Sequence, residues 1–123
     1  AKKYTVQGKT EADAKVLLAD AKALQDAGVF SIVLEMVAAE TTKRITEAVF
    51  VPTIGIGFGK DCDGQVLVIH DMLGLFEKLT PKFVKKYLSL SEEIKKAVAE
   101  YIKNVEDRTF PSEEHTFHME VRK

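Results

Sequence analysis

The stretch that decides the fold is GVFSIVLE, residues 28–35. From Val29 to Leu34 it is short, rich in β-branched residues and apolar except for Ser31, which predicts a strand that is buried on both faces. Gly28 is the residue type that ends helices in a left-handed conformation. This stretch therefore predicts a helix that ends at Gly28 and is followed at once by a buried strand.

Further elements extend outward from this strand on both sides. Thr10 is an N-cap residue with Asp13 three positions on, and it opens the helix before the strand. Apolar positions at helical spacing predict a second helix over about 39–49, and the β-branched runs 53–58 and 65–70 predict two more strands. The succession of helix, strand, helix, strand and strand is typical of a parallel α/β sheet.

Two helices are predicted after the last strand. Thr80 followed by Pro81 predicts a short helix through about Tyr87. Ser91 is expected to cap a longer helix that carries Glu92 and Lys96 as an i,i+4 ion pair on its outside. Its apolar stripe consists of Leu90, Ile94, Ala97, Val98, Tyr101, Ile102 and Val105. The tail from Phe110 is too polar and irregular to predict an element.

Composition restricts the class of protein. The 123 residues have a mass of 13.7 kDa and suit one domain, and the 18 basic and 19 acidic residues leave a formal charge of −1. This balance gives no basic surface for nucleic acid or an anionic membrane, so neither is expected as a partner. Cys62 is the single cysteine, which predicts a cytoplasmic protein without a disulfide. No apolar run reaches the 18 or so residues that cross a bilayer.

Glu35 is the first candidate functional residue. Alternation along a strand puts Val33 and Glu35 on one face, so that a carboxylate lies at the carboxyl end of a buried strand. Parallel α/β folds build their active sites at this end. An ordinary polar residue leaving a strand into solvent fits the position equally well.

Three glycines at period two form the second candidate. Gly55, Gly57 and Gly59 clear one face of the predicted strand, either for close approach of a ligand or for tight packing against a neighbour. The spacing G-x-G-x-G, without a clear following helix, does not match the dinucleotide fingerprint.

Other polar residues are weaker candidates. Asp61 and Asp63 lack the remaining ligands of a calcium loop. His70 with Asp71 could orient a substrate, although a structural role is commoner. A metal site in the tail would need an ordered geometry for His115, His118, Glu113 and Glu114.

Several ordered motifs together resemble a known family. The motifs are GVFSIVLE (28–35), RITEA (44–48), PTIGIG (52–57) and DGQVLVIHD (63–71). Together with YTVQGKT (4–10) and EEHTF (113–117), they closely resemble the 3-methyl-2-oxobutanoate (ketopantoate) hydroxymethyltransferases. The resemblance implies an α/β fold, the C-terminal part of a TIM (β/α)8 barrel with about its sixth to eighth strands, since a whole barrel takes about 250 residues. Residues 1–109 would form this half-barrel and residues 110–123 a C-terminal tail.

The resemblance also implies a reaction. The family transfers a hydroxymethyl group from 5,10-methylenetetrahydrofolate to 3-methyl-2-oxobutanoate, which gives 2-dehydropantoate in pantothenate biosynthesis. Glu35 falls on the family's proton acceptor, and we expect it to be partly buried with a raised pKa. The family's magnesium ligands lie in the N-terminal half, so no metal ligand is assigned to this chain, and the residues that bind folate are not identified.

The resemblance also implies partners for this chain. The chain should be active only when joined to the N-terminal half, within a homo-oligomer, and inactive alone. A non-catalytic half-barrel that acts as an interaction module is the alternative; the phosphoenolpyruvate mutase and isocitrate lyase group is another, but its motifs are not visible. Ala38 stands where the family commonly has Pro, and Phe58 where it has Ala; alternation points Phe58 away from the glycine face. Thr41 and Thr42, in place of more apolar residues, should loosen the second helix slightly.

Overall fold

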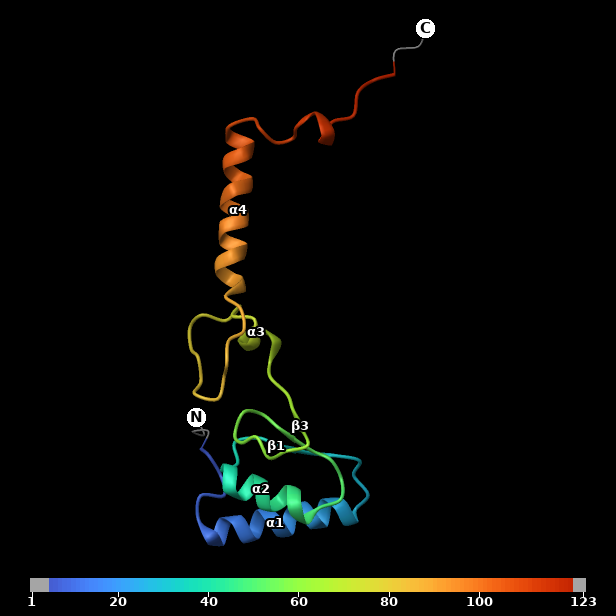
Figure 1. Cartoon of the computed structure of the whole chain (residues 1–123), viewed down its shortest axis with the longest axis vertical. Coiled ribbons are helices and arrows are strands. Elements are labelled where there is room, and N and C mark those ends of the chain that lie inside the picture. The colour runs from blue at the N-terminus through green and yellow to red at the C-terminus, as the bar shows by residue number, and fades with distance from the viewer. Residues whose placement is uncertain (1–4, 121–123) are drawn as a thin grey trace.

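The computed structural model describes residues 5–120, which form an α/β unit followed by an extended helical part (Figure 1). The strands pair in parallel in the order β1-β2-β3, so the prediction of an α/β fold with a parallel sheet is confirmed. Helices α1 and α2 pack side by side, whereas α4 stands away from the sheet (Figure 1). The elements are α1 (Glu11–Asp26), β1 (Ile32–Leu34), α2 (Ala39–Ala48), β2 (Thr53–Gly55), β3 (Gly64–Gln65), α3 (Ile69–Met72), α4 (Leu90–Glu106) and the 3-10 helix η1 (Glu113–His115).

Helix α1 begins and ends where the sequence predicts. The hydroxyl of Thr10 accepts a hydrogen bond from the backbone N–H of Asp13 at 3.1 Å. At the other end Gly28 has a φ of +87°, and its N–H donates to the carbonyl of Gln25 at 2.9 Å. The next N–H, of Val29, donates to the carbonyl of Leu24, which completes a Schellman motif. This turn directs the chain from α1 straight into β1.

The hydrophobic core lies between the sheet and the two helices. Ile45 on α2 is its most buried apolar residue, with 1% of its surface exposed. Thr41 and Thr42 are also buried, and the hydroxyl of Thr41 donates to the carbonyl of Gly8 at 2.8 Å. These threonines are therefore part of the packed face of α2. The core cluster consists of Ala21, Ile32, Leu34, Val37, Ile45 and Val49.

The sheet is covered on one face, so the prediction of a strand buried on both faces is wrong. Ile32 and Leu34 point into the core, whereas Val33 is 61% exposed and Phe30, before β1, is 89% exposed. Helices α1 and α2 lie on the same side of the strands (Figure 1), so that within residues 5–120 no helix covers Val33. All three strands are also shorter than predicted, since β2 pairs with β3 over only two residue positions.

Two predictions for the segment after β3 are wrong. His70 and Asp71 lie in α3 and not at the end of a strand, because the chain leaves the sheet after Gln65. The helix predicted from Thr80 to Tyr87 is absent, and one turn remains in which the N–H of Val84 donates to the carbonyl of Pro81 at 3.0 Å.

Helix α4 is formed as predicted, with differences at its start. Its N-cap residue is Ser89, and the hydroxyl of Ser91, in the first turn, donates to Glu77 at 2.8 Å. The predicted pair of Glu92 with Lys96 does not form; Lys95 pairs with Glu92 at 3.3 Å and Lys96 with Glu93 at 2.9 Å. The whole apolar stripe is partly or largely exposed. Within residues 5–120 no helix combines the length and apolar character needed to cross a membrane.

Candidate functional site

Glu35 directly follows β1 at the carboxyl edge of the parallel sheet, where the sequence placed it. Its side chain is exposed, so the expected partial burial is not found in this chain. The reason is the uncovered face of the sheet: Val33 on β1 and Val66 after β3 are exposed there as well. The carboxylate is thus held at the end of a strand whose opposite face is anchored in the core.

The residue after Glu35 has a strained backbone. Met36 has a φ of +55°, in the left-handed region that costs a residue with a β-carbon roughly 1 kcal/mol or more. The N–H of Gln7 donates to the carbonyl of Met36 at 2.7 Å, and the N–H of Ala38 donates to the carbonyl of Gln7 at 2.9 Å. These bonds hold the turn and fix the direction in which Glu35 leaves the strand. Methionine is not a residue type that favours turns, so this conformation could not be predicted from the local sequence.

A pocket of about 260 Å³ lies beside β1 and includes Glu35. Helix α1 contributes one wall with Leu17, Asp20 and Leu24, and β1 contributes the other. Within the described residues β1 is an edge strand, because it pairs with β2 alone. The pocket therefore follows the open edge of the sheet.

Side chains pack closely against Gly55 and Gly57, two of the three glycines at period two. This supports tight packing as the role of these two glycines. A methyl group at Gly55 would lie 2.8 Å from Nε2 of Gln65 and 3.0 Å from Sγ of Cys62. At Gly57 it would lie 2.7 Å from Cβ of Phe83, and the φ of +71° there also favours glycine.

The side chain of Gln65 forms hydrogen bonds with the backbone of Gly57 and Gly59. Its Oε1 accepts from the N–H of Gly57 at 3.2 Å, and its Nε2 donates to the carbonyl of Gly59 at 2.8 Å. The two bonds shape the loop that follows β2 at the same sheet edge as Glu35. Sequence reasoning missed this role, because it depends on which side chain lies across from the glycines.

Asp63 has a structural role. Its carboxylate accepts from the N–H of Thr53 at 2.8 Å and from the Thr53 hydroxyl at 3.1 Å. The backbone hydrogen bond from Thr53, followed by the hydroxyl bond, lowers the pKa of Asp63. The Thr53 hydroxyl also shares a hydrogen bond with that of Thr46 at 2.8 Å, which ties α2 to β2. These contacts account for Asp63 without a calcium ion.

The described residues do not fit a magnesium site. Between residues 5 and 120 no three acidic, histidine or cysteine side chains gather in a way that could hold a metal ion. In the tail, His118 pairs with Glu113 at 2.9 Å, and Nδ1 of His115 shares a hydrogen bond with Ser112 at 2.7 Å.

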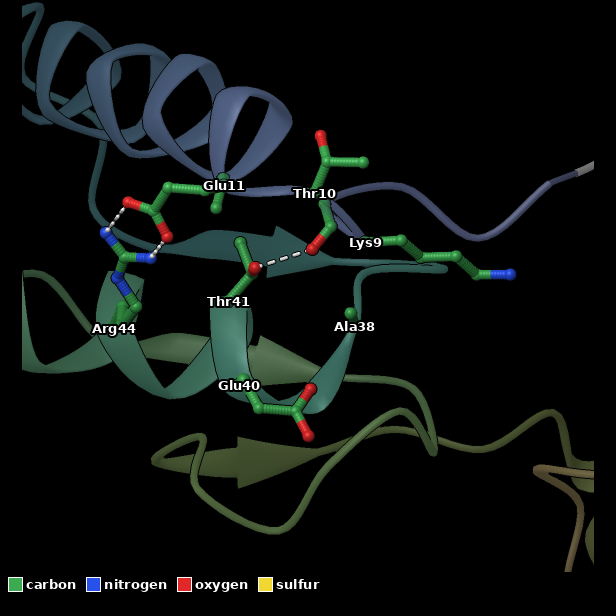
Figure 2. A pocket seen from close by; sticks show the side chains of 9 residues that line it. Lys9, Thr10, Glu11, Ala38, Glu40, Thr41 and Arg44 are labelled. Carbon is green, nitrogen blue, oxygen red and sulfur yellow. Dashed lines mark hydrogen bonds and ion pairs between the residues drawn. The ribbon is translucent and has the colours of Figure 1, made fainter.

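A further pocket, of about 310 Å³, lies where the starts of α1 and α2 meet (Figure 2). Arg44 holds Glu11 through two hydrogen bonds, at 2.8 and 3.1 Å. The bonded guanidinium lowers the pKa of Glu11, and Glu11 raises the pKa of Arg44. Lys9 and Glu40 extend away from this pair (Figure 2). The paired charges make this place a junction between two helices.

Comparison with known proteins identifies the family. Residues 1–113 match the family model described as ketopantoate hydroxymethyltransferase. A 3-methyl-2-oxobutanoate hydroxymethyltransferase of Syntrophus aciditrophicus is 54% identical over 114 residues, which are 93% of this chain and 42% of that protein. The one of Nitrosopumilus maritimus is 54% identical over 117 residues, 95% of this chain and 42% of that protein.

The chain thus spans about 42% of the length of these curated relatives. The motifs that suggested the resemblance lie within the matched residues, except for EEHTF (113–117), which begins at the last of them, and Glu35 is matched as well. The chain belongs to the ketopantoate hydroxymethyltransferase family.

Proposed function

We propose that this chain is the carboxyl-terminal part of an enzyme that transfers a hydroxymethyl group from 5,10-methylenetetrahydrofolate to 3-methyl-2-oxobutanoate. In this proposal β1, β2 and β3 are the sixth, seventh and eighth strands of a (β/α)8 barrel, and Glu35 is the general base. The observation that carries the proposal is the place of Glu35, at the carboxyl end of a parallel strand and before the strained turn at Met36.

The proposed reaction requires a base, and a carboxylate at the carboxyl end of β1 can serve as one. Glu35 takes the proton from C3 of the keto acid, and the electrons of that C–H bond move into the enolate. A water molecule adds to the one-carbon unit, and both bonds from that unit to the donor nitrogens break, so that each nitrogen gains a proton and the carbon is left as formaldehyde. The enolate carbon then forms a carbon–carbon bond with this carbon, and its oxygen takes the proton from Glu35 and becomes the hydroxyl group of the product. The ion Mg²⁺ is proposed to be held by carboxylates of the amino-terminal part, because the residues described here do not fit it.

The open surfaces of this chain support a need for further polypeptide. Within the described residues β1 and β3 are both edge strands, and the sheet face that carries Val33, Glu35 and Val66 is exposed. Unpaired strand edges and exposed apolar faces favour association with other chains or aggregation. We therefore propose that activity requires the amino-terminal part. The exposed stripe of α4 supports a homo-oligomer in addition.

The substitution Glu35→Gln in the full-length enzyme, meaning this chain joined to its proposed amino-terminal part, tests the general base. Isotope exchange at C3 of 3-methyl-2-oxobutanoate should fall at least about 100-fold, because the amide cannot accept the proton. Glu40→Gln is the matched control, since Glu40 is exposed at the start of α2 and should leave exchange unchanged.

Near-normal exchange by the Glu35→Gln enzyme would remove this residue from the mechanism. The 123-residue chain alone should show no exchange. Exchange by the isolated chain would contradict the requirement for the amino-terminal part. Binding of the keto acid by the full-length protein without any exchange would favour the non-catalytic interaction module.

A further inference from the structure

A third pocket lies at the carboxyl ends of β2 and β3. It has a volume of about 310 Å³, close to the lower limit for pockets that hold small molecules. It opens at the same sheet edge as Glu35, because Leu34 is in register with Gly55, and Gly55 with Gln65, in parallel pairs. Its lining includes Gly57, Gln65, Phe83, Lys85 and Tyr87.

One wall of this pocket is the aromatic ring of Phe83, which is held in place by residues that pack against it. The ring of Phe83 lies against the ring of Phe58, with centroids 5.1 Å apart and planes inclined by 36°. The backbone of Phe83 lies so close to Gly57 that no side chain would fit there. Phe58 thus packs against the back of the pocket and does not simply point away from the glycines. A second ring, that of Tyr87, also lines the pocket.

A cation stands beside these rings. Nζ of Lys85 lies 4.8 Å from the centroid of the Tyr87 ring. Within residues 5–120 Lys85 makes no ion pair with a carboxylate. The surrounding run KLTPKFVKKYL, residues 78–88, has four lysines and no acidic residue. Lys85 thus places a positive charge in the lining of the pocket, and a positive charge there favours an anionic ligand.

From these features we infer that the pocket binds an aryl ring that carries an acidic chain, with the ring against Phe83 and Tyr87 and a carboxylate of the chain at Lys85. The volume leaves room for the ring and this chain, and not for a whole folate. Resting on the proposed function, this group is the aryl-glutamate part of the one-carbon donor. The assignment puts the donor at the sheet edge where the enolate forms.

The probe for this site is 4-aminobenzoyl-glutamate, and its binding to the full-length enzyme is measured by calorimetry. Lys85→Met should weaken binding roughly tenfold, because a hydrogen bond to a charged group is lost. Lys86→Met is the matched control: it removes the same charge one position away, and Lys86 does not line the pocket. Binding to the control should change less than twofold.

Equal weakening by the two substitutions would show a general electrostatic effect and overturn the site. Absence of binding at millimolar probe would also overturn it. Isotope exchange at C3 of the keto acid, measured on the same samples, needs no donor and reports the proposed function separately. Exchange without probe binding rejects the pocket alone, whereas probe binding without exchange rejects the proposed function and leaves the pocket in place.

Discussion

Helices α2 and α4 carry the same kind of apolar stripe, but the two stripes differ in how far they are buried. Ile45 on α2 is 1% exposed, whereas Ile102 on α4 is 49% exposed. Helix α2 has α1 and the sheet to pack against, and α4 stands away from both (Figure 1). A periodic apolar stripe thus shows which face of a helix will be buried, but not which other part of the assembly packs against that face.

The two regions also differ in how their polar groups are satisfied. In the α/β unit, buried hydroxyls such as those of Thr41 and Thr53 are bonded across elements. Around the start of α4 the charged side chains form exposed ion pairs, among them Lys95 with Glu77 at 2.9 Å. We therefore expect the stability of the described residues to be concentrated in the α/β unit.

The largest effect should come from Ile45→Ala compared with Ile102→Ala. Loss of the Ile45 side chain leaves a cavity in the core and should lower the free energy of unfolding by about 2–5 kcal/mol, measured by urea titration of the full-length enzyme. Ile102→Ala should cost far less once dilution has dissociated the proposed homo-oligomer, because Ile102 is 49% exposed in this chain. Equal losses would show that α4 is covered in the assembly, and sedimentation would then reveal whether a second copy covers it.

A smaller effect is expected from Thr53→Val within the α/β unit. Valine has the same shape but leaves Asp63 and Thr46 without the buried hydroxyl, at a cost of roughly 1–3 kcal/mol in the same titration. Thr46→Val is the control, because it removes one of these bonds and keeps those to Asp63. The two variants losing equal stability would contradict the role given to Asp63.

The smallest effect should come from Lys95→Met at the start of α4. Hydrogen bonds from Lys95, and then from Ser91, lower the pKa of Glu77 from 4.5 to about 2. A carboxyl group with a lowered folded pKa stabilises the fold above pH 4.5, and this contribution is lost as the pH falls towards 2. Because the pair is exposed, Lys95→Met should shift the thermal midpoint only slightly at pH 7, and by less at pH 2, where Glu77 is partly protonated. Thr53→Val is measured in the same thermal scan, and a shift by Lys95→Met at pH 7 larger than that of Thr53→Val would contradict this ranking.

Local signals made much of the α/β unit predictable. Thr10 and Gly28 bound α1 because capping depends on residues within one turn. The parallel sheet followed from the alternation of helices and β-branched runs. The position of Glu35 followed from the strand before it, whereas its exposure depends on what covers the sheet.

The features that were missed depend on contacts between distant residues. Thr80 and Pro81 signal a helix start, but Phe83 packs instead against Gly57 and Phe58. The run from Val66 to Ile69 looks like a strand, yet β2 offers pairing only as far as Gln65. Met36 takes a left-handed conformation because Gln7 holds its carbonyl, and nothing in the neighbouring residues announces it.

The bonds made by Gln65 have a consequence for how the sheet edge responds to its medium. The carboxamide of Gln65 has both a hydrogen-bond donor and an acceptor, and it does not ionise. Its hydrogen bonds to Gly57 and Gly59 are therefore the same in acid and in base. Glutamate at this position would keep the acceptor, lose the donor and make the loop sensitive to protons. The sheet edge at which we propose proton transfer is thus stabilised by the Gln65 side chain, which neither gains nor loses a proton.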